Sequence, residues 1–235
     1  MQVAQDLVVP PLLLAGMGRI CSPTWRFISR VLYAQNLVSN GSFESGFTGW
    51  VLGGTVDSNT AVVINYNSTG AYPISAHGES VAPNNSGNIS PDVAGAKAAY
   101  FVSDFSSQNL TQTVHLRPGT YQIGLSAYAP NNGYVNSGDG QFTGSIAGVT
   151  LANYSISSNP AATWQTFYGE RTVTSEGDYL VQFSFVTNSN PSKDVVIDRV
   201  YVAPAPVPEP EAYAMLLCGL GLIGAMTRRR MNKKS

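Results

Sequence analysis

The sequence predicts an all-β chain, with a two-sheet sandwich or jelly-roll body followed by a single C-terminal transmembrane helix. Three observations predict it: short β-rich runs recur between turn signals, no ten-residue window of the body shows helical periodicity, and one uncharged apolar segment lies near the C-terminus. The chain divides accordingly into a leader of residues 1–35, a β body of residues 36–203 and a sorting and anchoring segment of residues 204–235.

Short strands account for the body. In the run that begins at Tyr121 every second residue is apolar or aromatic, which is the alternation of a half-buried strand. Turn residues precede two of the runs, at 117–119 and at 177–178. The predicted strands are Val62–Asn65, Ala98–Val102, Leu110–Leu116, Tyr121–Tyr128, Gly140–Leu151, Trp164–Val173, Tyr179–Val186 and Val195–Val202.

Charge and cysteine content exclude several classes of function. Residues 36–226 carry five basic and 13 acidic residues, a net charge of −8. Nucleic acid is excluded as a partner, because phosphate binding needs clustered Lys and Arg. The cysteines are Cys21 and Cys218, which lie outside the body, so the body is predicted to hold no disulfide, Cys-ligated zinc or Cys nucleophile.

The C-terminal segment has three parts in a fixed order. Prolines at every second position of 204–210 favour an extended spacer over a helix. Residues 212–226 carry no charge and, as a helix, would reach about 22 Å, to which flanking residues add. Five basic residues follow within 228–234, and the positive-inside rule keeps that end in the cytoplasm. The alternative, a buried core helix, would show polar residues on one face.

The tail from Val207 to Lys234 resembles the PEP-CTERM sorting signal, in which a Pro-Glu-Pro tripeptide precedes a short apolar helix and an Arg cluster. Here the tripeptide is Pro208, Glu209 and Pro210. The resemblance implies that exosortase, a membrane transpeptidase of bacteria that make exopolysaccharide, recognises these residues as substrate. It also implies an exported chain that is transiently anchored in the inner membrane and then reaches the cell surface or the extracellular matrix.

Such a chain needs a signal peptide, and the N-terminus fits that pattern in part. Residues 7–18 are apolar, but they follow Asp6, and no basic residue precedes them as it would in a typical signal peptide. A second apolar patch, 31–34, ends in a plausible cleavage site before Gln35 or Asn36. Either the signal is degenerate or the start of the chain lies elsewhere.

The body resembles the galactose-binding-like jelly roll of many carbohydrate-binding modules. The pieces that carry the resemblance are 36–44 with Trp50, 110–114, 118–121, 164–167, 177–180 and 196–202. In such modules the first loop and the last strand often meet at a structural calcium ion, and the matching positions here are Glu44 and Asp198. The alternative is an exposed glutamate in a turn and an aspartate paired with Lys or Arg.

Tyrosines in polar loops are candidates for stacking on sugar rings, although core packing explains most tyrosines of β proteins. The loop tyrosines are Tyr66, Tyr72, Tyr128 and Tyr134. Catalysis finds little support, because His77 and His115 are the only histidines and no nucleophile motif occurs.

Three functions stay open. The first hypothesis, which the sequence favours, is a non-enzymatic surface or matrix protein with a glycan-binding module. The second is a secreted glycoside-active enzyme, for which two carboxylates suffice. The third is a structural surface protein without a ligand. The sequence offers no reason to choose a catalytic pair among Glu44, Glu79, Glu170 and Glu176.

Overall fold

The computed structural model describes residues 35–54, 61–84, 90–104, 107–187, 191–206, 215–221 and 223. The chain divides into two compact units, Met1–Leu32 and Tyr33–Ser235, and every described residue belongs to the second. The predicted leader therefore lies outside the described residues, apart from Gln35.

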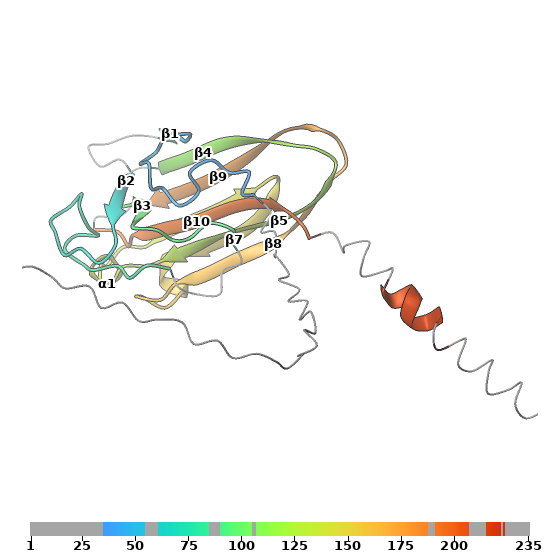
Figure 1. The fold of residues 1–235 in the computed structure, drawn as a ribbon. Helices are drawn as coiled ribbons and strands as arrows, with labels where there is room; N and C mark the ends of the chain where they lie inside the picture. Colours follow the sequence, from blue (N-terminus) through green and yellow to red (C-terminus); the bar gives the residue numbers. More distant parts are fainter. Residues whose placement is uncertain are drawn as a thin grey trace, which may run out of the picture. The chain divides into compact units, whose positions relative to one another are not determined.

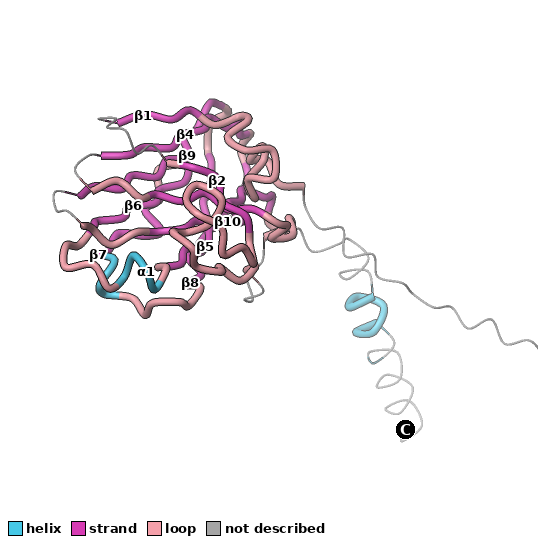
Figure 2. The backbone as a smooth tube through the Cα atoms, turned by 90° about the vertical axis from the view of Figure 1, so that its left-hand side faces the viewer, coloured by secondary structure: helices cyan, strands magenta, loops and turns pink. Residues whose placement is uncertain are grey.

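Two five-stranded antiparallel sheets form a β-sandwich (Figure 1). The first sheet has the order β1-β4-β9-β6-β7 and the second the order β2-β3-β10-β5-β8, so strands distant in sequence are neighbours in both. Figure 2 shows the strands of the two sheets as separate layers. The strands are β1 (Val51–Gly54), β2 (Val62–Asn65), β3 (Lys97–Phe101), β4 (Ser107–Leu116), β5 (Gly119–Tyr128), β6 (Gly140–Ile146), β7 (Val149–Ser155), β8 (Gln165–Val173), β9 (Gly177–Thr187) and β10 (Val195–Pro204). The short helix α1 (Asn131–Tyr134) and the 3-10 turn η1 (Ile156–Ser158) complete the elements of this part of the chain.

The main core lies between the sheets. Alternation supplies it: in β4 the residues Leu110, Val114 and Leu116 are buried, while Thr113 and His115 between them are exposed. The outer face of the first sheet is consequently mostly polar, although Leu180 and Val186 of β9 are exposed on it.

The outer face of the second sheet is covered over β3 and β10, whereas β8 stays exposed. Its side chains, including Tyr100 of β3 and Val196 of β10, pack with Tyr66, Ala76 and Val81 from the long β2–β3 connection into a second hydrophobic cluster. This connection therefore acts as a third layer, and polar groups of β10 become buried beneath it.

The N-terminal segment of the body lies along β10. The Leu37 amide donates to the Val202 carbonyl at 2.7 Å, and the Val200 amide donates to the Gly41 carbonyl at 2.9 Å. The first loop and the last strand are thus neighbours.

The structure corrects two predicted boundaries. Gly140–Leu151 is not one strand but the β6–β7 hairpin, which turns at Ala147 and Gly148 with φ angles of 49° and 80°. Positive φ at both positions is what a type I′ turn requires, and Ala-Gly is not among its usual sequence signals. The turn predicted at 177–178 lies earlier, because Gly177 already begins β9.

Candidate functional site

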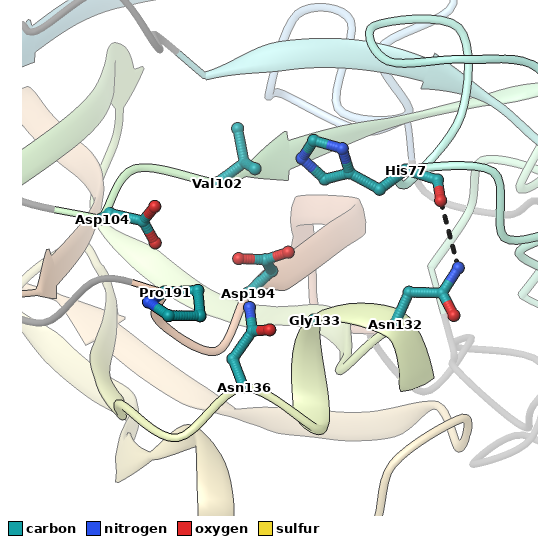
Figure 3. Close-up of a pocket in the computed structure, with 8 residues that line it drawn as sticks. All are labelled: His77, Val102, Asp104, Asn132, Gly133, Asn136, Pro191 and Asp194. Atoms are coloured by element: carbon teal, nitrogen blue, oxygen red, sulfur yellow. Dashed lines mark hydrogen bonds between the residues drawn. The ribbon is translucent and has the colours of Figure 1, made fainter.

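A polar pocket of about 300 Å³ opens at the end of the sandwich where β10 begins. Four segments build it: the β2–β3 connection, the residues after β3, the α1 region and the residues before β10. Figure 3 shows the Asp194 carboxyl near the middle of the lining side chains. These are His77, Val102, Asp104, Asn132, Gly133, Asn136, Pro191 and Asp194.

Asp194 is the buried carboxyl group of the pocket, with only 3% of its surface exposed. The Tyr100 hydroxyl donates to its Oδ2 at 2.5 Å. The backbone of α1 passes so close that a Cβ added to Gly133 would collide with the same carboxyl group. The glycine in α1 is therefore what lets the helix close over the aspartate.

Burial raises the pKa of Asp194 from its ordinary value of 3.8 to about 7, because the charged form loses its water. The Tyr100 hydrogen bond works in the opposite direction, and the charge of Asp104 raises the pKa further. Near neutral pH this carboxyl group exists in both forms.

A second carboxylate forms one wall. Oδ1 of Asp104 accepts the Ser192 amide at 2.6 Å, and the Asn136 side-chain amide donates to the Ser192 carbonyl at 2.6 Å. The nearby ammonium of Lys193 donates to the Tyr134 and Asn136 carbonyls at 2.6 and 2.7 Å and lies over the Tyr134 ring. The cation is thus engaged with main-chain oxygens.

The opposite wall is held by a carboxylate outside the pocket. Glu79 accepts the Asn132 amide at 2.8 Å and the Tyr128 hydroxyl at 3.1 Å. The side-chain amide of Asn132 donates to the His77 carbonyl at 3.1 Å, as Figure 3 shows. The His77 ring stacks on Tyr72 with 4.9 Å between ring centroids, which fixes the imidazole at the rim.

The lining is rich in hydrogen-bond acceptors. Two carboxyl groups and two side-chain amides face a space that also touches the apolar side chains of Val102 and Pro191. Such an arrangement suits a ligand that offers several hydroxyl or amine donors and one apolar face. Sequence reasoning missed Asp104 and Asp194. A charge immediately before the apolar run Val195–Ile197 was the available signal.

The residues predicted to hold calcium lie in the second region of interest. Oε1 of Glu44 accepts the amides of Ala96 and Lys97, both at 2.8 Å, and the Lys97 ammonium donates to the Glu44 carbonyl at 3.0 Å. This carboxylate is exposed, and one of its two oxygens is occupied by amide donors.

Asp198 is fully buried beneath the β2–β3 connection. Its Oδ2 accepts the Tyr66 hydroxyl at 2.6 Å, whereas Oδ1 has no hydrogen-bond partner among the described residues. Burial raises the pKa of the carboxyl group well above its ordinary range, and the charge of Glu44 adds to this. An orphaned buried oxygen fits a cation ligand, although no group of three or more His, Cys, Asp or Glu in the described part of the chain could hold a metal.

Strand alternation predicts that Arg199 and Asp198 point to opposite faces, and a β-bulge between Asp198 and Tyr201 breaks that alternation. Arg199 adopts a positive φ of 52°, and its guanidinium donates to the carbonyls of Asn84 and Ser90 in the covering connection. Its charge lowers the pKa of Asp198, so the arginine does act on the aspartate.

Several of the other candidates have structural partners. Of the loop tyrosines, Tyr66 and Tyr128 are buried and donate to carboxylates. Glu176 accepts from His115 at 3.0 Å, and Glu170 lies exposed on β8. The tripeptide Pro208, Glu209 and Pro210 lies outside the described residues.

Residues 215–221 and 223 are helical, and in the described part of the chain no helix is long and apolar enough to span a bilayer.

The family model of the PEP-CTERM protein-sorting motif matches residues 206–230. The chain carries a PEP-CTERM sorting motif. This confirms the resemblance of the tail to that family.

Solved structures similar to the body include carbohydrate-binding modules and the enzymatically active domain of tailspike protein 4 of bacteriophage CBA120 (18% identity, 72% of this chain and 21% of that chain, TM-score 0.43). The modules include TmCBM61 in complex with beta-1,4-galactotriose (19% identity, 73% of this chain and 100% of that chain, TM-score 0.48) and a family 16 module (14%, 72% and 99%, 0.41). The CBM22-1 xylan-binding domain of Paenibacillus barcinonensis Xyn10C is a third (12%, 74% and 97%, 0.41). A comparison with curated proteins finds no match.

Proposed function

We propose that this chain is an exported envelope protein that exosortase sorts through its C-terminal tail, and that its β-sandwich binds glycan. The PEP-CTERM motif at residues 206–230 carries the first part of the proposal. The acceptor-rich pocket supports the second. The protein acts at the cell surface or in the exopolysaccharide matrix, after a transient stay in the inner membrane.

The anchor in this proposal is a transmembrane helix formed by the uncharged residues 212–226, of which 215–221 and 223 are described as helical. Leaving β10 at Pro204, the chain keeps one more contact, from the Ala205 amide to the Thr120 carbonyl at 2.9 Å. The spacer therefore begins directly at the sandwich.

The sorting proposal is tested in a host that contains exosortase. Replacing Pro208, Glu209 and Pro210 together by alanine is expected to leave the full chain uncleaved in the membrane fraction, because the recognition element is gone. The control is Glu170→Ala on the exposed face of β8, which should be processed like the wild type. Normal cleavage of the triple variant would contradict the proposal.

Calcium remains a proposal for Glu44 and Asp198. A bound ion would satisfy the orphaned Oδ1 of Asp198 and tie the first loop to the last strand. Ion binding to the folded state alone would raise the midpoint of thermal unfolding. The expected result is a calcium-dependent rise that chelator removes, that Asp198→Ala abolishes and that Asp178→Ala retains. Equal midpoints with calcium and with chelator would refute the site.

One observation favours a glycoside-active enzyme as the alternative. Asp104 and Asp194 line one pocket, and a carboxyl group that keeps its proton to about pH 7 suits a general acid. Release of reducing ends from a polysaccharide that Asp194→Asn abolishes would establish this alternative, and binding without release supports the glycan-binding function.

A further inference from the structure

We infer that the pocket around Asp194 binds a single non-anionic sugar unit, at a chain end or side branch, and presents this site at the end of the sandwich opposite to the tether. This inference rests on the proposed glycan-binding function, and it adds where on the sandwich the glycan binds and which class of sugar it is.

The size of the pocket sets the first limit. A volume of about 300 Å³ is at the low end of small-molecule sites, which span roughly 300–1,000 Å³. It fits one sugar ring with part of a neighbour. The apolar side chains of Val102 and Pro191 and the fixed imidazole of His77 offer flat or apolar surface to the ring.

The polar groups set the second limit, which concerns charge. Asp194 and Asp104 supply carboxylate acceptors, and each is already held in place, by the Tyr100 hydroxyl and by the Ser192 amide. Carboxylates held in this way accept from vicinal sugar hydroxyls without reorganising. A uronic acid would bring a third carboxylate beside Asp104 and the buried Asp194, where like charges repel more strongly than in bulk water.

The nearby cation does not offset this acidity. Lys193 does not line the pocket, and its ammonium lies over the Tyr134 ring and donates to two main-chain carbonyls, so two of its three N–H donors are already used. Glu79, behind the opposite wall, adds a further negative charge. The pocket therefore selects against anions.

The strand β10 connects the pocket end of the sandwich with the end at which the C-terminal tail begins. Asp194 immediately precedes β10, and the chain leaves the sandwich after Pro204, at the other end of the same strand. Ten residues at about 3.3 Å each separate the two by roughly 30 Å. In Figure 1 the α1 end and the end from which the chain departs lie on opposite sides of the sandwich. A sandwich tethered at residue 206 thus presents the pocket at its far end.

The test uses the full chain in a zwitterionic detergent, because alkyl maltosides would compete for a sugar site. Saturation-transfer NMR at pH 8, where Asp194 is ionised, compares methyl β-glucoside and methyl β-galactoside with the matching methyl uronides. The wild type should bind at least one neutral glycoside, and its uronide about tenfold or more weakly.

Two isosteric variants and one control locate the site. Asp194→Asn should abolish binding of the neutral glycoside. Asp104→Asn keeps an acceptor for Ser192 and should reduce the discrimination against the uronide. Glu170→Gln on β8 should bind as the wild type does, and circular dichroism shows whether each variant is folded.

A parallel assay separates the inference from the function on which it rests. Affinity electrophoresis measures retardation by neutral and acidic polysaccharides. Retardation that survives in folded Asp194→Asn, or equal binding of glucoside and glucuronide, overturns the pocket assignment and leaves glycan binding standing. Absence of any glycan binding overturns both.

Discussion

The two ends of the sandwich hold similar residues in different surroundings. At the α1 end, His77, Asp104 and Asp194 line a pocket. At the opposite end His115 lies between Glu176 and Asp178, at 3.0 and 2.8 Å, on the exposed outer face of the first sheet.

The surroundings decide the chemistry of each end. Burial raises the pKa of Asp194 to about 7, so that carboxyl group changes its charge near neutral pH. Hydrogen bonds to Glu176 and Asp178 raise the pKa of the His115 imidazole, and the pKa of Glu176 is lowered in return. Exposed, water-screened charges of this kind contribute little stability. Of the three pocket residues only Asp194 is buried, because His77 is exposed and Asp104 is half-buried. The chemical difference between the two ends therefore rests on the burial of one carboxyl group.

The largest expected effect that separates the two ends is the pH dependence of stability. Asp194 binds its proton more tightly in the folded state than in the unfolded state. Proton binding therefore adds fully to the free energy of unfolding below pH 3.8, and this addition is lost as the pH rises toward 7. The loss amounts to about 4 kcal/mol at most, at about 1.4 kcal/mol per pKa unit. Urea unfolding of the wild type and of Asp194→Asn from pH 4 to 8 should show the variant gaining relative stability as the pH rises.

The control at the exposed end is Asp178→Asn, which should show no such gain over the same range. Parallel pH profiles for the wild type and Asp194→Asn would contradict the buried, proton-holding carboxyl group.

The tolerance for an added side-chain atom should also differ between the two ends. A Cβ at Gly133 would collide with the Asp194 side chain, whereas a Cβ at Gly177 would meet no atom within 4 Å. Gly133→Ala is expected to cost about 1–3 kcal/mol through overpacking. Gly177→Ala should stay within about 0.5 kcal/mol of the wild type in chemical denaturation. Equal effects of the two substitutions would mean that α1 does not close over Asp194.

The smallest of the three effects concerns two tyrosine hydroxyls. Tyr100 donates to buried Asp194, and Tyr179 donates to the Ser175 carbonyl at 2.9 Å in an exposed position. Tyr100→Phe should destabilise the chain by about 1–2 kcal/mol at pH 8, because an ionised buried acceptor loses its donor. Tyr179→Phe should change the free energy of unfolding by less than about 0.5 kcal/mol. The same denaturation assay measures both, and a larger loss for Tyr179→Phe would reverse the comparison.

The sequence predicted more of the fold than of the site. Alternation located most strands of the body, because one buried face imposes a period of two on each strand. It missed β1, where the Gly53-Gly54 pair dilutes the pattern, and it merged β6 with β7 across the Ala-Gly turn.

The pocket was beyond such reasoning for a topological reason. More than fifty residues lie between His77 and Asn132, and again between Asn132 and Asp194. The three residues meet only because β10 lies between β3 and β5 in the second sheet. Period-two patterns say which face a residue occupies and nothing about which loops converge at one end. The C-terminal motif, by contrast, is contiguous, and its three parts in sequence order were sufficient to predict it.

The central claim is that a sugar binds at the α1 end of the sandwich. Hydrogen–deuterium exchange of the full chain, with and without a saturating neutral glycoside, tests it most directly. The account predicts slower exchange in residues 102–104, 129–139 and 191–194, with no change near His115. Protection of β4 and β9 on the polar outer face of the first sheet, with the pocket loops unchanged, would contradict it.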